Sequence, residues 1–140
     1  MALALRGHCR ELEGVDSNPA VLRAALERGV LDRAATLDEA RWCDVVVLAA
    51  PVRGILAQLD ELRRPPLPAQ PVTVLDLGST KAEIVEAMAR LPEAFDPIGG
   101  HPMCGKEVSG LAHAEQSLFE NKVFVLVPLE RTTPRALALA

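Results

Sequence analysis

The stretch from Gly99 to Gly110 holds the residues of this chain that are best suited to chemistry. Four of its twelve residues are glycines, which give up backbone order that a packed element would keep. Pro102 fixes its own φ and restrains His101 to an extended conformation. Because an imidazole titrates near neutral pH, a histidine held in this way could act as a general acid or base. The residues alone leave a second interpretation open, a glycine-rich surface loop with an incidental histidine.

A second motif precedes this stretch by about twenty residues. It reads Asp76-Leu77-Gly78-Ser79-Thr80-Lys81, and it is followed by Gly99-Gly100-His101-Pro102-Met103-Cys104-Gly105. The two runs, in this order, resemble the prephenate and arogenate dehydrogenases of tyrosine biosynthesis, and the resemblance extends from Met1 to about Pro128. It implies an NAD-dependent oxidoreductase that converts prephenate to 4-hydroxyphenylpyruvate, or arogenate to tyrosine, by oxidative decarboxylation.

The resemblance implies roles for several side chains of these motifs. His101 would accept the proton of the substrate's ring hydroxyl, and Ser79 would hydrogen-bond toward the nicotinamide and the substrate hydroxyl, so both are expected to be catalytic and substrate-binding. From the residues alone, Ser79 is most simply a helix N-cap, and Lys81 either stabilises a bound carboxylate or the loop, or is solvated. Lys106 stands where many relatives have Ser or Thr. It could bind a substrate carboxylate, which leaves the choice between prephenate and arogenate open.

The elements expected around these motifs alternate between strands and helices. Asp44–Ala50 contains a continuous β-branched run, which predicts a strand buried on both faces of a parallel sheet. Helices are expected where a capping residue precedes a proline, as at Asn18-Pro19 and Thr133-Pro134. The other expected elements are helices over Met1–Arg6, from Thr36 to Trp42, from Pro51 to Leu62 and from Ser79 or Thr80 to Leu91, and strands over Leu12–Asp16, Val72–Asp76, Pro97–Gly100 and Val123–Val127. This alternation predicts an α/β fold, a doubly wound (Rossmann-type) parallel sheet.

Cofactors bind such sheets at the carboxyl ends of the strands. Asp16 ends a strand, where its carboxylate could accept hydrogen bonds from the adenosine ribose and repel a 2′-phosphate, which favours NAD over NADP. It could also simply cap the turn that follows it. Ala50 and Pro51 follow one buried strand, and Gly78 and Ser79 follow the next. These four residues are therefore expected to lie beside the cofactor.

The chain contains no G-x-G-x-x-G run, the turn that binds a dinucleotide pyrophosphate. In the family resemblance, Met1–Arg6 corresponds to the second half of the helix that follows this turn. Residues 1–140 are accordingly expected to be an incomplete NAD(P)-binding domain, without the first strand, the glycine-rich loop and the helical C-terminal domain through which the family forms homodimers. Such a fragment is expected to be inactive alone. The alternative is a non-catalytic Rossmann remnant that acts only by association with a partner chain.

Composition narrows the classes of function. Apolar residues make up 49% and charged residues 24% of the 140 residues, which is typical of a globular domain. A net charge of −4 and an aromatic content of 3% argue against binding nucleic acid or an anionic membrane. Cys9, Cys43 and Cys104 lack metal-ligand spacing and are expected to be reduced thiols of a cytoplasmic protein. His8 and His113 are expected to be exposed bystanders.

Overall fold

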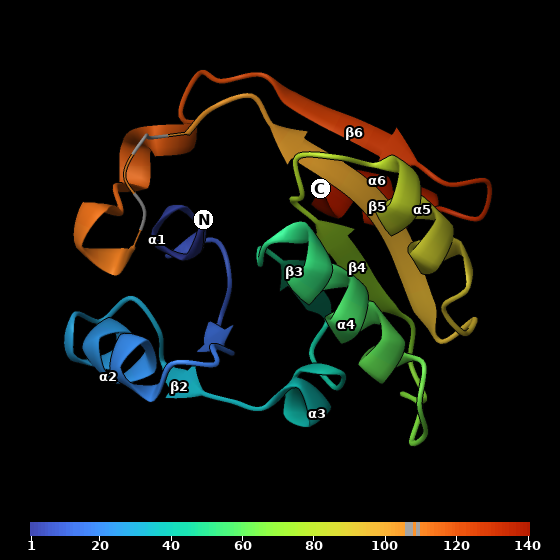
Figure 1. Ribbon diagram of the computed structural model, residues 1–140, viewed down its shortest axis with the longest axis horizontal. Helices are drawn as coiled ribbons and strands as arrows, with labels where there is room; N and C mark the ends of the chain where they lie inside the picture. The colour runs from blue at the N-terminus through green and yellow to red at the C-terminus, as the bar shows by residue number, and fades with distance from the viewer. Residues whose placement is uncertain (106–107, 109) are drawn as a thin grey trace. The chain divides into compact units, whose positions relative to one another are not determined.

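The computed structural model describes residues 1–105, 108 and 110–140. Its contacts divide the chain into two compact units, coloured by residue number in Figure 1. One unit contains Met1–Thr36 and Met103–Val123, and the other contains Leu37–Pro102 and Phe124–Ala140.

The larger unit contains a four-stranded sheet in the order β3-β4-β5-β6. The strands β3, β4 and β5 run parallel, and β6 is antiparallel to β5. The bounds of the strands are β3 Val45–Leu48, β4 Val72–Asp76, β5 Phe95–Pro102 and β6 Phe124–Pro128. The helices of this unit are α3 Leu37–Ala40, α4 Val52–Leu62, α5 Ala82–Ala89 and α6 Pro134–Leu139. Helices connect neighbouring parallel strands, α4 between β3 and β4 and α5 between β4 and β5, as parallel pairing requires.

Helices cover both faces of this sheet, with α4 and α5 on one face and α6 on the other (Figure 1). Ile55, Leu59 and Leu62 recur at helical spacing in α4 and are fully buried. They pack with Val74 of β4, whereas Leu75, which points to the opposite face, packs with Ala136 of α6. Each fully buried aliphatic side chain of this kind contributes about 1.5–3 kcal/mol. Burial on both faces of the sheet therefore stabilises this unit.

The smaller unit has much shorter strands. Its elements are α1 Ala2–Leu5, β1 Glu13–Gly14, α2 Pro19–Glu27, β2 Arg33–Ala34 and the 3₁₀ turns η1 Leu111–His113 and η2 Gln116–Phe119. β1 and β2 pair in parallel. Arg6 forms an ion pair with Asp32 at 2.6 Å, and this hydrogen bond, together with one from the Leu12 N–H, lowers the pKa of Asp32. The ion pair links the chain after α1 to the start of β2.

Several expectations from the sequence are confirmed. Asn18 caps α2 by accepting a hydrogen bond from Ala20 N at 3.0 Å, and Thr133 caps α6. Val72–Asp76 is a strand with every residue buried. The fold class is confirmed as α/β with a predominantly parallel, Rossmann-like sheet.

Other expectations are wrong in detail. β3 is not buried on both faces: Val46 and Leu48 on one face are buried, but Val45 and Val47 on the other face are only half-buried. The strand expected over Pro97–Gly100 is longer, and it includes His101 and Pro102. The expected strand Leu12–Asp16 shortens to two paired residues.

Candidate active site

The three parallel strands bring most of the expected site residues to one edge of the sheet, here called the carboxyl edge. Leu48 at the end of β3 lies opposite Asp76 at the end of β4, and Asp76 lies opposite Gly99 of β5. The residues that follow these positions therefore leave the sheet at the same level. They are Ala50 and Pro51 after β3, Gly78 and Ser79 after β4, and His101 near the end of β5.

His101 lies in β5 rather than in a loop, and its partner across the ladder to β6 is Val125. Its imidazole is half-buried, and Nδ1 lies 3.1 Å from the carbonyl oxygen of Gly78. A carbonyl oxygen accepts hydrogen bonds only, so Nδ1 is the donor in this contact. In the neutral ring, the lone pair is then on Nε2. This arrangement suits a proton acceptor that acts through Nε2.

Asp76 lies behind His101 and is completely buried. One carboxylate oxygen, Oδ2, accepts a hydrogen bond from Gly78 N at 2.9 Å and forms an ion pair with Lys81. The other, Oδ1, lies 3.4 Å from Gly100 N, which donates to it. The two sequence motifs are thus joined by one carboxylate.

Glycines make room for this carboxylate. A Cβ atom at Gly78 would lie 3.2 Å from Asp76 Oδ2, and one at Gly99 would lie 3.4 Å from Asp76 Oδ1. At Gly100 a Cβ atom would lie 2.8 Å from Leu75 Cδ1 and 3.0 Å from the Asp76 carbonyl oxygen. Gly99 and Gly100 therefore serve close packing inside β5 and not the flexibility of a loop, which corrects the interpretation of the glycine-rich stretch.

The N-cap interpretation of Ser79 is wrong, and of the alternatives for Lys81 the solvated lysine is wrong, whereas stabilisation of the loop agrees with its ion pair to Asp76. α5 begins at Ala82 and its N-cap is Lys81, so Ser79 does not cap the helix. Ser79 is exposed on the turn between β4 and α5. Lys81 is not a solvated lysine, because its side chain is 19% exposed and paired with Asp76. Gly78 N and the Lys81 ammonium both bind Asp76, so the turn between β4 and α5 is tied to this carboxylate.

Asp16 belongs to the smaller unit, where it is exposed after β1. Its Oδ1 accepts a hydrogen bond from Asn18 N at 2.8 Å, so the turn-capping interpretation of this residue is confirmed. The bond occupies one oxygen only and is compatible with a further role for the carboxylate. Lys106, the expected partner of a substrate carboxylate, lies outside the described residues.

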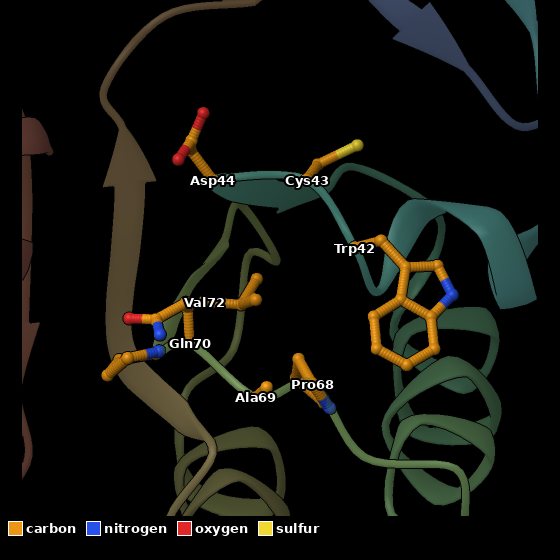
Figure 2. Close-up of a pocket in the computed structure, with 8 residues that line it drawn as sticks. Trp42, Cys43, Asp44, Pro68, Ala69, Gln70 and Val72 are labelled. Carbon is orange, nitrogen blue, oxygen red and sulfur yellow. The ribbon is translucent and has the colours of Figure 1, made fainter.

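The opposite edge of the sheet, here called the amino edge, carries two hollows. One has a volume of about 220 Å³ and lies between the start of β3 and the proline-rich connection to β4 (Figure 2). The second, of about 430 Å³, lies by the start of β5 and the turn before α6. Neither hollow is lined by an expected site residue. The lining residues of the first are Trp42, Cys43, Asp44, Pro68, Ala69, Gln70, Pro71 and Val72.

Among the residues that the structure describes, no group of three or more His, Cys, Asp or Glu side chains could hold a metal ion. Within the same part of the chain, no helix is both long enough and apolar enough to cross a membrane.

Comparison with known proteins decides the family. The model of the prephenate dehydrogenase nucleotide-binding domain matches residues 1–140. The chain belongs to this family.

Individual relatives agree with the family assignment. The chain is 34% identical over 130 residues to a prephenate dehydrogenase of Bacillus subtilis, covering 91% of this chain and 35% of that protein. The crystal structure of Aquifex aeolicus prephenate dehydrogenase in complex with hydroxyphenyl propionate and NAD⁺ is similar over 99% of this chain and 49% of that chain, with a TM-score of 0.86 and 30% identity. For Synechocystis arogenate dehydrogenase, the TM-score is 0.87 with 33% identity, over 99% and 49% of the two chains. The chain thus spans about a third of the curated relative and half of the solved ones.

The prephenate dehydrogenase domain offers part of the surroundings that a nicotinamide dinucleotide needs. Small, uncharged residues follow the strands at the carboxyl edge, with Ala49 exposed and Ala50 half-buried. They present no bulky or charged side chain to a flat ring at this edge. In the smaller unit, taken by itself, Asp16 is exposed two residues after β1. The 140 residues contain no G-x-G-x-x-G turn, so they do not include the main-chain groups that such a turn offers to a pyrophosphate. The small residues of the larger unit are thus compatible with a nicotinamide ring at this edge.

Sequence reasoning missed the role of Asp76. The signal was available, because Asp-x-Gly at the end of a buried strand allows the carboxylate to accept from the N–H two residues on. The contact of Asp76 with Gly100 could not be predicted from the sequence, because it depends on the register between β4 and β5.

Proposed function

We propose that this chain is the NAD-binding portion of a dehydrogenase that oxidatively decarboxylates prephenate to 4-hydroxyphenylpyruvate, or arogenate to tyrosine, in tyrosine biosynthesis. The observation that carries the proposal is the contact between His101 Nδ1 and the Gly78 carbonyl oxygen at the carboxyl edge, which leaves Nε2 as the acceptor. Membership in the prephenate dehydrogenase family supports the reaction type.

The proposed chemistry divides between cofactor and protein. Bound NAD would supply the hydride acceptor for the carbon that carries the ring hydroxyl. His101 Nε2 accepts the hydroxyl proton as that carbon is oxidised. The electron pair of the bond to the carboxylate enters the ring as CO₂ leaves, the ring becomes aromatic, and the proton returns to the oxygen. His101 is thus restored without net proton uptake.

The other expected site residues have supporting roles in this proposal. The exposed hydroxyl of Ser79 orients the substrate hydroxyl toward His101. Ala50, Pro51 and Gly78 lie beside the nicotinamide half of the cofactor. Lys106 pairs with a substrate carboxylate.

We propose Asp16 as the residue that selects NAD. It would accept hydrogen bonds from the ribose hydroxyls, and its charge would face the 2′-phosphate of NADP at short range. The complete protein would act as a homodimer through residues beyond this chain.

The proposal is tested with the protein produced from its complete reading frame. NADH formation is followed with prephenate and with arogenate, with either NAD or NADP as cofactor. We expect turnover with at least one substrate and a higher kcat/KM with NAD. No turnover with either substrate would favour the alternative of a non-catalytic Rossmann remnant.

The Asp16→Ser variant tests the cofactor assignment separately. We expect it to lose kcat/KM with NAD and to gain with NADP, because the serine keeps a hydrogen-bonding group but removes the charge. Asp60→Ser is the matched control, since Asp60 is an exposed carboxylate of the larger unit whose partners Arg63 and Arg64 are also exposed. Equal use of the two cofactors by the unmodified protein would count against Asp16.

A further inference from the structure

The carboxylate of Asp76 is buried, so other groups must replace the water that would otherwise bind it. Asp76 is 0% exposed, and taking a carboxylate out of water is unfavourable unless a counter-charge and hydrogen bonds replace the water. Lys81 supplies the charge, and the N–H groups of Gly78 and Gly100 supply hydrogen bonds. Among the described residues these three groups account for both carboxylate oxygens.

The peptide groups that Asp76 binds are the ones that hold His101. Gly78 donates its N–H to Asp76, and its carbonyl oxygen accepts from His101 Nδ1. Gly100 precedes His101 in the chain and donates to the other oxygen of the same carboxylate. Asp76 therefore contacts the histidine's surroundings from two sides, through the turn after β4 and through β5.

Three glycines, which have no side chain, line the space around Asp76. Each of the three glycines nearest to it would place a Cβ atom within 3.4 Å of an Asp76 atom. Such contacts are tighter than, or at the limit of, ordinary van der Waals separation. The Asp-x-Gly and Gly-Gly-His runs are therefore two halves of one structure.

We propose that Asp76 and Lys81 are positioning residues for His101. The carboxylate, neutralised by Lys81, orients the Gly78 and Gly100 peptides so that the Gly78 carbonyl fixes the imidazole as the Nδ1–H tautomer, with the lone pair on Nε2. This inference rests on the proposed function only in taking His101 as the proton acceptor. It assigns Lys81 to the protein's own carboxylate rather than to a carboxylate of the substrate.

The first test needs no variant. Nitrogen-15 NMR of the imidazole, recorded on the complete protein at a pH where the ring is neutral, distinguishes a protonated Nδ1 from a protonated Nε2. We expect Nδ1 of His101 to carry the proton. A ring protonated at Nε2 would overturn the inference.

The second test removes the counter-charge. In Lys81→Met, the Asp76 carboxylate loses its partner and the Gly78 peptide loses its fixed orientation. We expect a mixture of tautomers and a fall in kcat of roughly 10- to 100-fold, since small misplacements of a reacting group have effects of this size. The substrate KM should change much less, because Lys81 does not touch the substrate. Lys81→Arg keeps a cation beside Asp76 and should retain most of the Nδ1–H tautomer.

Arg90→Met is the matched control. Arg90 forms an ion pair with Glu86 on the same helix, with both side chains more than half exposed, and it should alter neither the tautomer nor kcat. If Lys81→Met does not fold, Lys81→Gln takes its place, because it keeps a hydrogen-bond donor for Asp76 without the charge.

The outcomes separate this inference from the proposed function. A large rise in KM with an unchanged tautomer in Lys81→Met would mean that Lys81 binds substrate, and it would overturn the positioning role. Unchanged kcat and tautomer would overturn it as well. If His101→Asn itself left kcat intact, the proposed function would fail instead, whatever Lys81 does.

Discussion

The carboxyl and amino edges of the four-stranded sheet are formed by the same strands, yet they differ in kind. The amino edge has the two hollows, lined largely by a proline-rich connection and by the turn before α6. The carboxyl edge has the buried Asp76, which is paired with Lys81, and the half-buried His101, and both Asp76 and His101 bind the main chain of Gly78. The candidate site is therefore recognised by the polar groups that meet at the Asp76 carboxylate, and not by the size of a hollow.

Two arginines near the amino edge have a different task. Arg41 is 1% exposed, and its Nη1 donates to the carbonyl oxygens of Arg64 and Pro66, each at 2.6 Å. Arg131 donates to the carbonyl oxygens of Phe95 and Leu91, each at 2.8 Å. Both arginines satisfy main-chain carbonyls where connections meet the sheet. They stabilise loops and present no group that could exchange a proton near neutral pH.

The largest effect is expected from His101→Asn. Asparagine can still donate to the Gly78 carbonyl but cannot accept a proton, so kcat should fall roughly 10²- to 10⁴-fold. The substrate KM should change less, because the proton moves mainly in the transition state. Steady-state kinetics of the complete protein measure both values.

The pH dependence of kcat gives the same prediction a second readout. A protonated imidazole cannot accept a proton, so kcat of the unmodified protein should fall on the acidic side of the profile, and this limb should vanish in His101→Asn. His8→Asn, at an exposed histidine of the smaller unit, should keep it. A surviving acidic limb in His101→Asn, with only stability and KM affected, would reduce His101 to a structural residue.

A smaller effect is expected from Gly100→Ala. The added Cβ atom would lie 2.8 Å from both Leu75 Cδ1 and Phe124 Cε1 and 3.0 Å from the Asp76 carbonyl oxygen, so these side chains or β5 itself must shift. Overpacking of this kind costs about 1–3 kcal/mol of the free energy of unfolding, which urea titration measures. Gly105→Ala is the control, because its Cβ atom would have no neighbour within 4 Å. Equal stability of the two variants would show that β5 tolerates a side chain beside Asp76.

The sequence predicted the elements whose signals are local. Asn18 and Thr133 were recognised as caps from one or two neighbours, and Val72–Asp76 was recognised as a buried strand from its composition. Features that depend on strand pairing could not be predicted from the sequence. The run around Val125 predicted a strand but not its antiparallel direction, because apolar composition is the same in either direction.

In the candidate site, too, local features were predicted from the sequence and contacts between strands were not. His101 was singled out by Pro102 and by the flanking glycines, which are local features. Its partner Gly78 is 23 positions away in sequence, and the two meet only because β4 and β5 are adjacent and in register. Serine prefers the N-cap position, which favours Ser79 as the cap, but α5 begins at Ala82 and its N-cap is Lys81.

The smallest effect is expected at the amino edge, from Ala69→Leu. Ala69 is exposed and lines the smaller hollow, where Figure 2 shows it between Pro68 and Gln70. A leucine there adds volume to the hollow without touching the buried core. Substitutions at such surface positions usually change the free energy of unfolding by no more than about 0.5 kcal/mol. Since the residues that we propose for proton transfer lie at the other edge, kcat/KM should stay within about twofold. A loss of tenfold or more in a folded Ala69→Leu protein would mean that the amino edge binds a group needed for turnover, and the contrast between the two edges would no longer hold.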